Sequence, residues 1–279
     1  MTSNTIEQDR YCIHQVTLME QCDFQQSIEC FAKHGIPQTA IWRDKVDAIS
    51  DKDARSILND NGVKPVALCP GILLAEDPRE DLTVAMDANR KLLEQTSNLG
   101  ADSLVVITGG LANSERDIDG ARSRAEDSLA QLADYARDAG VRLAIEPLHP
   151  MICGLRSVIS TLNEANDMLD RIDKDDVLGI VLDTYALWWQ PGLKSQIVRS
   201  GNRIIHLHVS DWLQDTCDVR LDRGMPGDGV IDNQKIRSWV EAAGYTGPVE
   251  VEIFSRRNWW TKSADEVVQT IIDRYPLHL

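Results

Sequence analysis

The sequence lacks the patterns that mark several large classes of protein. No GxGxxG or GxxxxGK[ST] motif follows the first predicted strand, which argues against an open nucleotide-binding sheet. The cysteines show no CxxC spacing, so neither a disulfide framework nor a zinc–thiolate site is expected. No low-complexity segment or break in composition marks a second domain. The six cysteines are Cys12, Cys22, Cys30, Cys69, Cys153 and Cys217.

Positive charge and long apolar runs are also scarce. The chain has 29 Lys and Arg against 44 Asp and Glu, a net charge of -15 at pH 7. Nucleic acids and anionic membranes are therefore unsuited as partners, because their phosphates would be repelled. No apolar run approaches the ~20 residues of a membrane span, and the first residues, MTSNTIEQDR, lack an apolar signal core. We expect a soluble, cytoplasmic protein with reduced thiols.

Strand-like and helix-like segments alternate along all 279 residues. Eight strands alternating with eight helices predict a parallel sheet, and eight units are what a closed (β/α)8 barrel needs. Such a barrel fits one domain of this length, so residues 1–279 are expected to form a single domain. The predicted strands are 11–16, 38–42, 64–69, 103–108, 141–146, 178–183, 203–209 and 248–254. The predicted helices are 24–35, 51–62, 81–100, 121–140, 158–172, 193–201, 233–244 and 263–275.

Four potential metal ligands lie at or near the ends of the last four predicted strands. They are Glu146, Asp183, His208 and Glu252. The carboxyl ends of barrel strands meet on one face, where active sites lie, so these side chains are expected to converge. Three carboxylates and one imidazole favour a hard divalent cation. We expect Mn²⁺, with Mg²⁺, Co²⁺ and Zn²⁺ as alternatives.

Glu146 and Glu252 also suit proton transfer. They come from the fifth and eighth strands and could flank a substrate. One carboxylate would remove a proton and the other would return it, while the metal stabilises the enediolate between the two steps. Pure ligand roles for both remain the alternative.

Other side chains near these strand ends are candidates for substrate contact. His149 follows Glu146 in the same loop, and Trp188 and Trp212 follow the sixth and seventh strands, where indole rings could stack on a sugar. Core packing under loops is the alternative for the tryptophans.

We choose His208 over His206 as the metal ligand because His208 is nearer the end of the strand. The two side chains are expected on opposite faces of the strand. His206 would then face the helices or lie deeper in the barrel, as a buried neutral histidine.

Residues 211–232 form the longest loop, between the seventh strand and the seventh helix. Long loops without secondary structure often act as lids over active sites. The segment has a Gly- and Pro-rich backbone and carries Arg220, Asp222, Arg223 and Asp228.

Taken together, these segments resemble the sugar phosphate isomerase/epimerase superfamily. This is the xylose-isomerase-like TIM barrel group, which includes AP endonuclease family 2. The resemblance rests on AIEP, LD before an aromatic pair, HLHVSDW, DRGMPGDGVID and EVEIFS, with IWRDKV and ALCPG fitting as well. It implies that Glu146, Asp183, His208 and Glu252 bind the metal, that Glu146 and Glu252 transfer protons, and that Arg223 contacts a substrate oxygen or phosphate.

The chain departs from the family pattern at two positions. Ala186 stands where members usually have a histidine that contacts substrate, and Leu155 stands where an acid usually precedes Arg156.

The resemblance implies an isomerase or epimerase of a keto sugar, inosose or related polyol. Two alternatives stay open: a lyase of the inosose dehydratase or deglycosidase type using the same site, and a non-catalytic pseudoenzyme. The exact substrate and the oligomeric state are also open, a homo-oligomer included.

Overall fold

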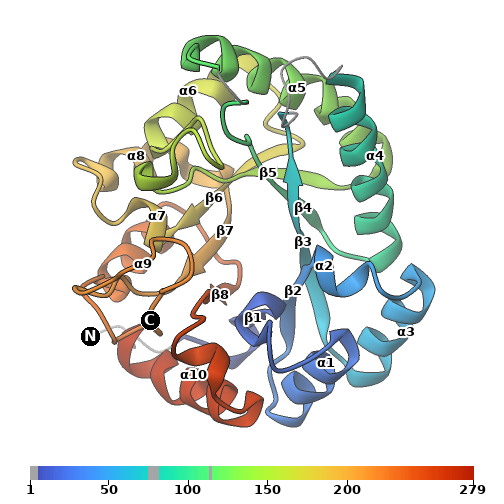
Figure 1. Cartoon of the computed structure of the whole chain (residues 1–279), viewed down its shortest axis with the longest axis vertical. Helices are drawn as coiled ribbons and strands as arrows, with labels where there is room; N and C mark the ends of the chain where they lie inside the picture. The colour runs from blue at the N-terminus through green and yellow to red at the C-terminus, as the bar shows by residue number, and fades with distance from the viewer. Residues whose placement is uncertain (1–5, 75–81, 113–114) are drawn as a thin grey trace.

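Eight parallel strands close into a barrel in this computed structural model, and helices surround the barrel (Figure 1). The structure describes residues 6–74, 82–112 and 115–279. Each strand pairs with the next in sequence, and β1 pairs with β8, so the predicted (β/α)8 barrel is confirmed. The strands are β1 (Tyr11–His14), β2 (Gln38–Trp42), β3 (Lys64–Ile72), β4 (Ser103–Ile107), β5 (Arg142–Ile145), β6 (Leu178–Asp183), β7 (Ile204–Val209) and β8 (Val249–Val251).

All eight predicted helices are present. Two further short helices, α2 (Arg43–Val46) and α7 (Thr184–Leu187), directly follow β2 and β6 and have no counterpart in the sequence pattern. The first residue of the predicted helix 81–100 lies outside the described residues. The eight long helices are α1 (Phe24–Lys33), α3 (Asp51–Asn61), α4 (Leu82–Leu99), α5 (Ile118–Ala139), α6 (Leu162–Ile172), α8 (Leu193–Ser200), α9 (Asn233–Ala242) and α10 (Ala264–His278).

Local signals explain where several helices begin and end. The expected start of α6 at residue 158 is wrong, because Thr161 caps the helix and forms a reciprocal capping box with Glu164. Gly62 and Gly140 end α3 and α5 in the left-handed conformation, with φ of 66° and 68°. A side chain would be strained there, so glycine ends these helices at little cost.

The strands separate two apolar layers. One layer packs between strands and helices and includes Leu207, Val209, Val249 and Val251. The other layer fills the inside of the barrel, where β2, β3 and β5 contribute the small residues Ala40, Ala67 and Ala144. Small side chains on these strands leave room inside the barrel for larger polar side chains from β7 and β8. None of the described helices is long and apolar enough to cross a membrane.

Candidate active site

Three of the four predicted metal ligands converge at the carboxyl end of the barrel. Glu146 and Glu252 directly follow β5 and β8, and His208 lies near the end of β7. One ligand atom from each of these three residues lies within 4.8 Å of the others. The Nδ1 atom of His208 is 3.3 Å from Oε1 of Glu146 and 3.8 Å from Oε2 of Glu252.

The fourth predicted ligand, Asp183, lies beside this group, but Arg223 is inserted between them. Asp183 is the last residue of β6 and is fully buried. Nη1 of Arg223 is 3.2 Å from Oδ2 of Asp183 and 3.0 Å from Oε2 of Glu252, so one guanidinium joins the two carboxylates. The other oxygen of Asp183 accepts the backbone N–H of Tyr185 at 2.9 Å. Arg223 therefore connects Asp183 to Glu252.

Three buried atoms in this group make no hydrogen bond within the described part of the chain. They are Oε1 of Glu146 and both ring nitrogens of His208, although Oε1 and Nδ1 lie 3.3 Å apart. Buried polar atoms are nearly always paired, by protein, water or a metal. An imidazole nitrogen and two carboxylate oxygens also form a donor set that suits a divalent cation. The residues present therefore fit a metal ion.

Ionisation in the site reflects its excess of acids. Burial raises the pKa of Asp183 to about 6, with Glu146 and Glu252 adding to the rise. Burial lowers the pKa of His208, but the surrounding carboxylates, Glu146 first, outweigh burial and raise it to about 10. In the absence of a cation, a proton on His208 thus offsets part of the negative charge. A metal ion would displace this proton on binding.

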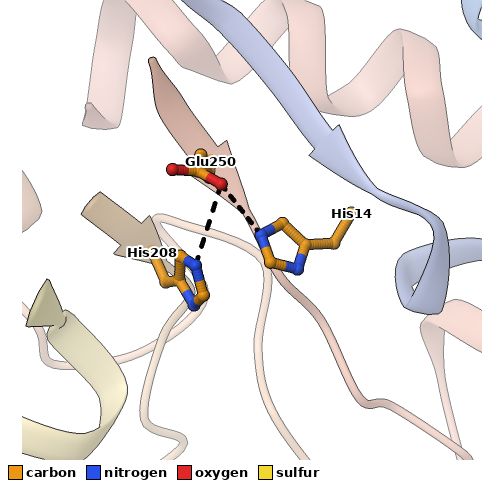
Figure 2. A group of neighbouring side chains, drawn as sticks. All are labelled: His14, His208 and Glu250. Carbon is orange, nitrogen blue, oxygen red and sulfur yellow. Dashed lines mark hydrogen bonds and ion pairs between the residues drawn. The ribbon is translucent and has the colours of Figure 1, made fainter. Parts of the chain in front are cut away.

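A second group of acids and imidazoles lies deeper in the barrel, and sequence reasoning missed it. Glu250 on β8 is fully buried between His14 and His208, as Figure 2 shows. Its Oε2 lies 3.2 Å from Nε2 of His14 and 3.7 Å from Nε2 of His208. Its Oε1 lies 2.7 Å from Nδ1 of His206, whose Nε2 is 2.6 Å from Oγ of Ser103.

The expectation that His206 and His208 face opposite sides of their strand is wrong. Residues two apart in a strand point to the same face, and both rings lie inside the barrel. The same rule makes Glu250 and Glu252 share the interior face of β8. The alternation in HLH and EVE is the sequence signal that could have identified the deeper group.

A pocket that is partly open to solvent is lined by Glu146 and Glu252. Its charged wall also carries Arg156, Arg220 and Arg223. Its apolar wall is formed by Trp42, Ile107, Leu148, Ile152 and Phe254.

The aromatic residues predicted to bind substrate lie elsewhere. Trp188 lines a separate groove with Lys194 and Trp239. Trp212 stacks on the ring of His149, with centroids 4.6 Å apart. None of the three predicted residues is among those that line the pocket over Glu146. Trp42 is the tryptophan at that pocket.

The long segment 211–232 is held in place. Arg223 is buried and joins Asp183 to Glu252, as described above. Single β-bridges link Asp211 to Gly224 and Asp222 to Ser255. Asp228 accepts hydrogen bonds from Trp259 and Arg274. These contacts hold the segment as a fixed wall of the site and do not indicate a mobile lid.

Neither departure from the family pattern leaves a gap at the pocket. Ala186 on α7 is buried in the apolar layer between strands and helices. Leu155 is 77% exposed. Neither residue is among those lining the pocket, whereas the neighbouring Arg156 is.

The fold and its carboxyl-end site define a class of (β/α)8 barrel proteins, and sequence comparison identifies the family. Residues 26–273 match the family model for the xylose isomerase-like TIM barrel, AP endonuclease family 2. The chain belongs to this family.

The relatives are isomerases, epimerases and dehydratases. An inosose isomerase of Bacillus velezensis is 24% identical over 276 residues, 94% of each chain. A 3-dehydroshikimate dehydratase of Pseudomonas aeruginosa is 26% identical over 211 residues, which are 74% of this chain and 32% of that protein.

Two solved structures are close matches. A crystal structure of a Sinorhizobium meliloti 1021 protein has a TM-score of 0.93 and 42% identity, covering 96% of this chain and 98% of that one. The IOLI protein, solved with a bound zinc atom, has a TM-score of 0.84 and 22% identity, covering 95% of each chain.

Proposed function

We propose that this protein is a divalent-metal-dependent isomerase or epimerase that enolises a carbohydrate-like α-hydroxyketone. One observation carries the proposal. Glu146, His208 and Glu252 bring ligand atoms within 4.8 Å of one another at a pocket, and two of these atoms are buried and make no hydrogen bond to the residues that the structure describes. Inosose isomerases among the relatives support the reaction class.

The proposed metal ligands are Glu146, His208 and Glu252, with Asp183 as the fourth. Oxygen-rich ligands favour Mn²⁺, although zinc usually binds such sites more tightly. The zinc atom of the IOLI structure shows that a related barrel holds a divalent ion. The bound cation would act as a Lewis acid on the substrate's oxygens.

The two glutamates are the proposed proton-transfer groups. Their carboxylates project from β5 and β8 onto the same pocket. One takes the proton from the carbon beside the carbonyl group; the electron pair of that C–H bond forms a carbon–carbon double bond, and the π pair of the carbonyl group moves onto its oxygen. The other glutamate, protonated at the start of the reaction, then donates its proton to a carbon of the resulting enediolate. Donation to the same carbon from the opposite face gives an epimer, and donation to the neighbouring carbon, with the hydroxyl proton passing to the former carbonyl oxygen, gives an isomer.

Arg223 is proposed to set the charge and position of the acids. Burial lowers the pKa of Arg223, but Asp183 and Glu252 outweigh burial and raise it above its usual value. A permanent cation at this position holds the Glu252 carboxylate ionised, ready to accept a proton. It also lies over the rings of Tyr185 and Phe254, at 4.5 and 4.9 Å from the centroids, which fix the guanidinium plane.

Solvent hydrogen exchange tests the proposal most directly. Protein loaded with Mn²⁺ is incubated in D₂O with a panel of ketohexoses, inososes and 3-dehydroshikimate, and deuterium at the carbon beside the carbonyl group is followed by NMR. We expect exchange with at least one compound and much slower exchange with Glu252→Gln. Exchange at the same rate in both proteins would refute the proposal.

A lyase is the second candidate, and the match to 3-dehydroshikimate dehydratases favours it. The same first proton transfer would be followed by loss of a hydroxyl group as water from the neighbouring carbon. Product analysis of the exchanging compounds separates the two reactions, since an isomer keeps its mass and a dehydrated product loses one water.

A further inference from the structure

Two arginines line the pocket without a side-chain partner among the residues that the structure describes. Arg156 follows the turn after β5, and Arg220 lies in the 211–232 segment. Both line the pocket together with Glu146 and Glu252. Neither guanidinium makes a hydrogen bond or ion pair with any residue in the described ranges. Arg223 in the same pocket differs, because two carboxylates hold it.

The two unpaired guanidiniums lie close enough to repel each other. Burial lowers the pKa of Arg156, and the nearby charges of Arg220 and Arg43 lower it further, while Glu146 opposes them. Clustered cations are unfavourable in a partly buried position unless an anion joins them. They are also unusual in a chain whose net charge is -15. Residues that bind a ligand often lower the stability of the folded protein, and a cluster of cations at a pocket is typical of such residues.

The acids of the site do not account for this positive charge once a metal is bound. Glu146, Asp183 and Glu252 carry three negative charges. Arg223 and a divalent cation together supply three positive charges. Within this set the charges balance, so Arg156 and Arg220 add two positive charges to the pocket wall beside the metal ligands.

We propose that the substrate carries a carboxylate or phosphate group, which Arg156 and Arg220 bind together while its ketone end lies over Glu146 and Glu252. This inference rests on the proposed function for the ketone end only. Planar guanidinium groups pair with both kinds of oxyanion through two parallel hydrogen bonds. Trp42 and Phe254 supply an apolar wall for the carbon skeleton between the two ends. Neutral keto sugars and inososes are then poor substrates.

Binding of matched probes tests the anion site. Mn²⁺-loaded protein is titrated calorimetrically with quinate and its uncharged amide, and with fructose 6-phosphate and fructose. Within each pair the oxyanion is the main difference, and the two pairs distinguish a carboxylate from a phosphate. We expect one anion to bind at least about 10-fold more tightly than its neutral partner, the usual effect of hydrogen bonds to a charged group.

The variants Arg156→Gln and Arg220→Gln should each abolish that preference, with the neutral probes unaffected. Arg256→Gln is the matched control, because Arg256 is an exposed arginine beyond β8 that does not line the pocket. It should leave the preference intact. Equal loss in all three variants, equal binding of anion and neutral partner, or no binding of either anion at millimolar concentration would overturn the proposal.

The result is separable from that of the exchange experiment. Anion binding that depends on both arginines, without deuterium exchange on any ketone, would keep the anion site and remove the proposed function. Exchange with equal kcat/KM on neutral and anionic ketones would keep the proposed function and remove the anion site.

Discussion

Glu250 and Glu252 lie two residues apart on one side of the barrel, yet their surroundings differ. Glu250 is fully buried, and both of its oxygens have imidazole partners, His206 at 2.7 Å and His14 at 3.2 Å. Glu252 borders the pocket, where Arg223 contacts it at 3.0 Å. His14 joins the two acids, because its other nitrogen is 3.3 Å from Glu252.

The difference separates a buried supporting layer from the layer that we propose to be reactive. Around Glu250, imidazoles and a serine hydroxyl form a chain of hydrogen bonds closed off from solvent. Burial raises the pKa of Glu250, but His206 and His14 outweigh it and hold the pKa well below its usual range. Around Glu252, atoms of Glu146 and His208 stay unpaired. His208 spans both layers, with Nδ1 3.3 Å from Glu146 and Nε2 3.7 Å from Glu250.

The largest effect is expected from His208→Ala, which removes the residue shared by the two layers. Loss of one metal ligand should lower metal affinity more than ~100-fold. This exceeds the loss expected when a residue that only supports a ligand is replaced. Elemental analysis after dialysis measures the metal content. His278→Ala is the control, since this exposed histidine at the end of α10 is in none of the groups of described residues that could hold a metal ion. Full metal occupancy in His208→Ala would show that the ligand assignment is wrong.

Glu146→Gln and Glu252→Gln test the reactive layer alone. Each should lower kcat by ~10²-fold or more, the usual cost of losing a positioned acid or base. Part of the metal should remain, because an amide oxygen still coordinates. Steady-state rates at saturating metal, with metal content measured in the same samples, check this result. Near-normal turnover in both variants would exclude the two-carboxylate mechanism.

Glu250→Gln sharpens the comparison with Glu252→Gln. It leaves His208 in place but removes the charge behind its Nε2, so metal affinity should fall ~10–100-fold. Excess metal should restore most of kcat in Glu250→Gln, and we expect no such recovery in Glu252→Gln. Metal titrations of activity, with circular dichroism to confirm folding, measure the difference. If kcat at saturating metal stays as low as in Glu252→Gln, the two acids do not have separate roles.

The smallest effect concerns His149, whose imidazole forms no ion pair with a carboxylate among the described residues. Burial, and then Arg223, lower its pKa to about 4, so the folded protein keeps it neutral. Between pH 6.5 and 4 the unfolded chain binds a proton there that the folded protein does not. Acidification through this window should therefore destabilise the wild type relative to His149→Gln, by on the order of 1–3 kcal/mol.

Urea unfolding of both metal-free proteins at a series of pH values measures this difference. A difference between wild type and variant that stays constant from pH 6.5 to 4 would contradict it. The comparison also distinguishes His149 from His208, whose pKa of about 10 is shifted in the opposite direction by its carboxylates.

Much of the architecture could be predicted because it depends on local patterns. Apolar runs separated by amphipathic segments indicated the eight strands and eight helices, and residues at strand ends necessarily share one face of a parallel barrel. Glu146, His208 and Glu252 were found together by that rule alone. Boundaries such as the start of α6 depended on a capping box, which a hydrophobic pattern does not reveal.

The positions of long side chains could not be predicted in the same way. Trp188 and Trp212 follow strands as Trp42 does, but they pack away from the pocket, and only Trp42 lines it. Arg223 lies far from Asp183 and Glu252 in the chain, yet it joins them. Loop paths decide such contacts, and loops follow no period.

The sequence by itself determined the barrel, the face that bears the site and the acids and imidazole that converge there, because the periodicity of strands and helices is a local property. The tertiary structure decided the rest. It placed Glu250 beneath Glu252 and Arg223 beside Asp183. It also brought Arg156 and Arg220 to the pocket wall, where neither side chain pairs with a described residue. The physical reason is that partners for buried charges come from distant segments, and only closure of the barrel sets those distances.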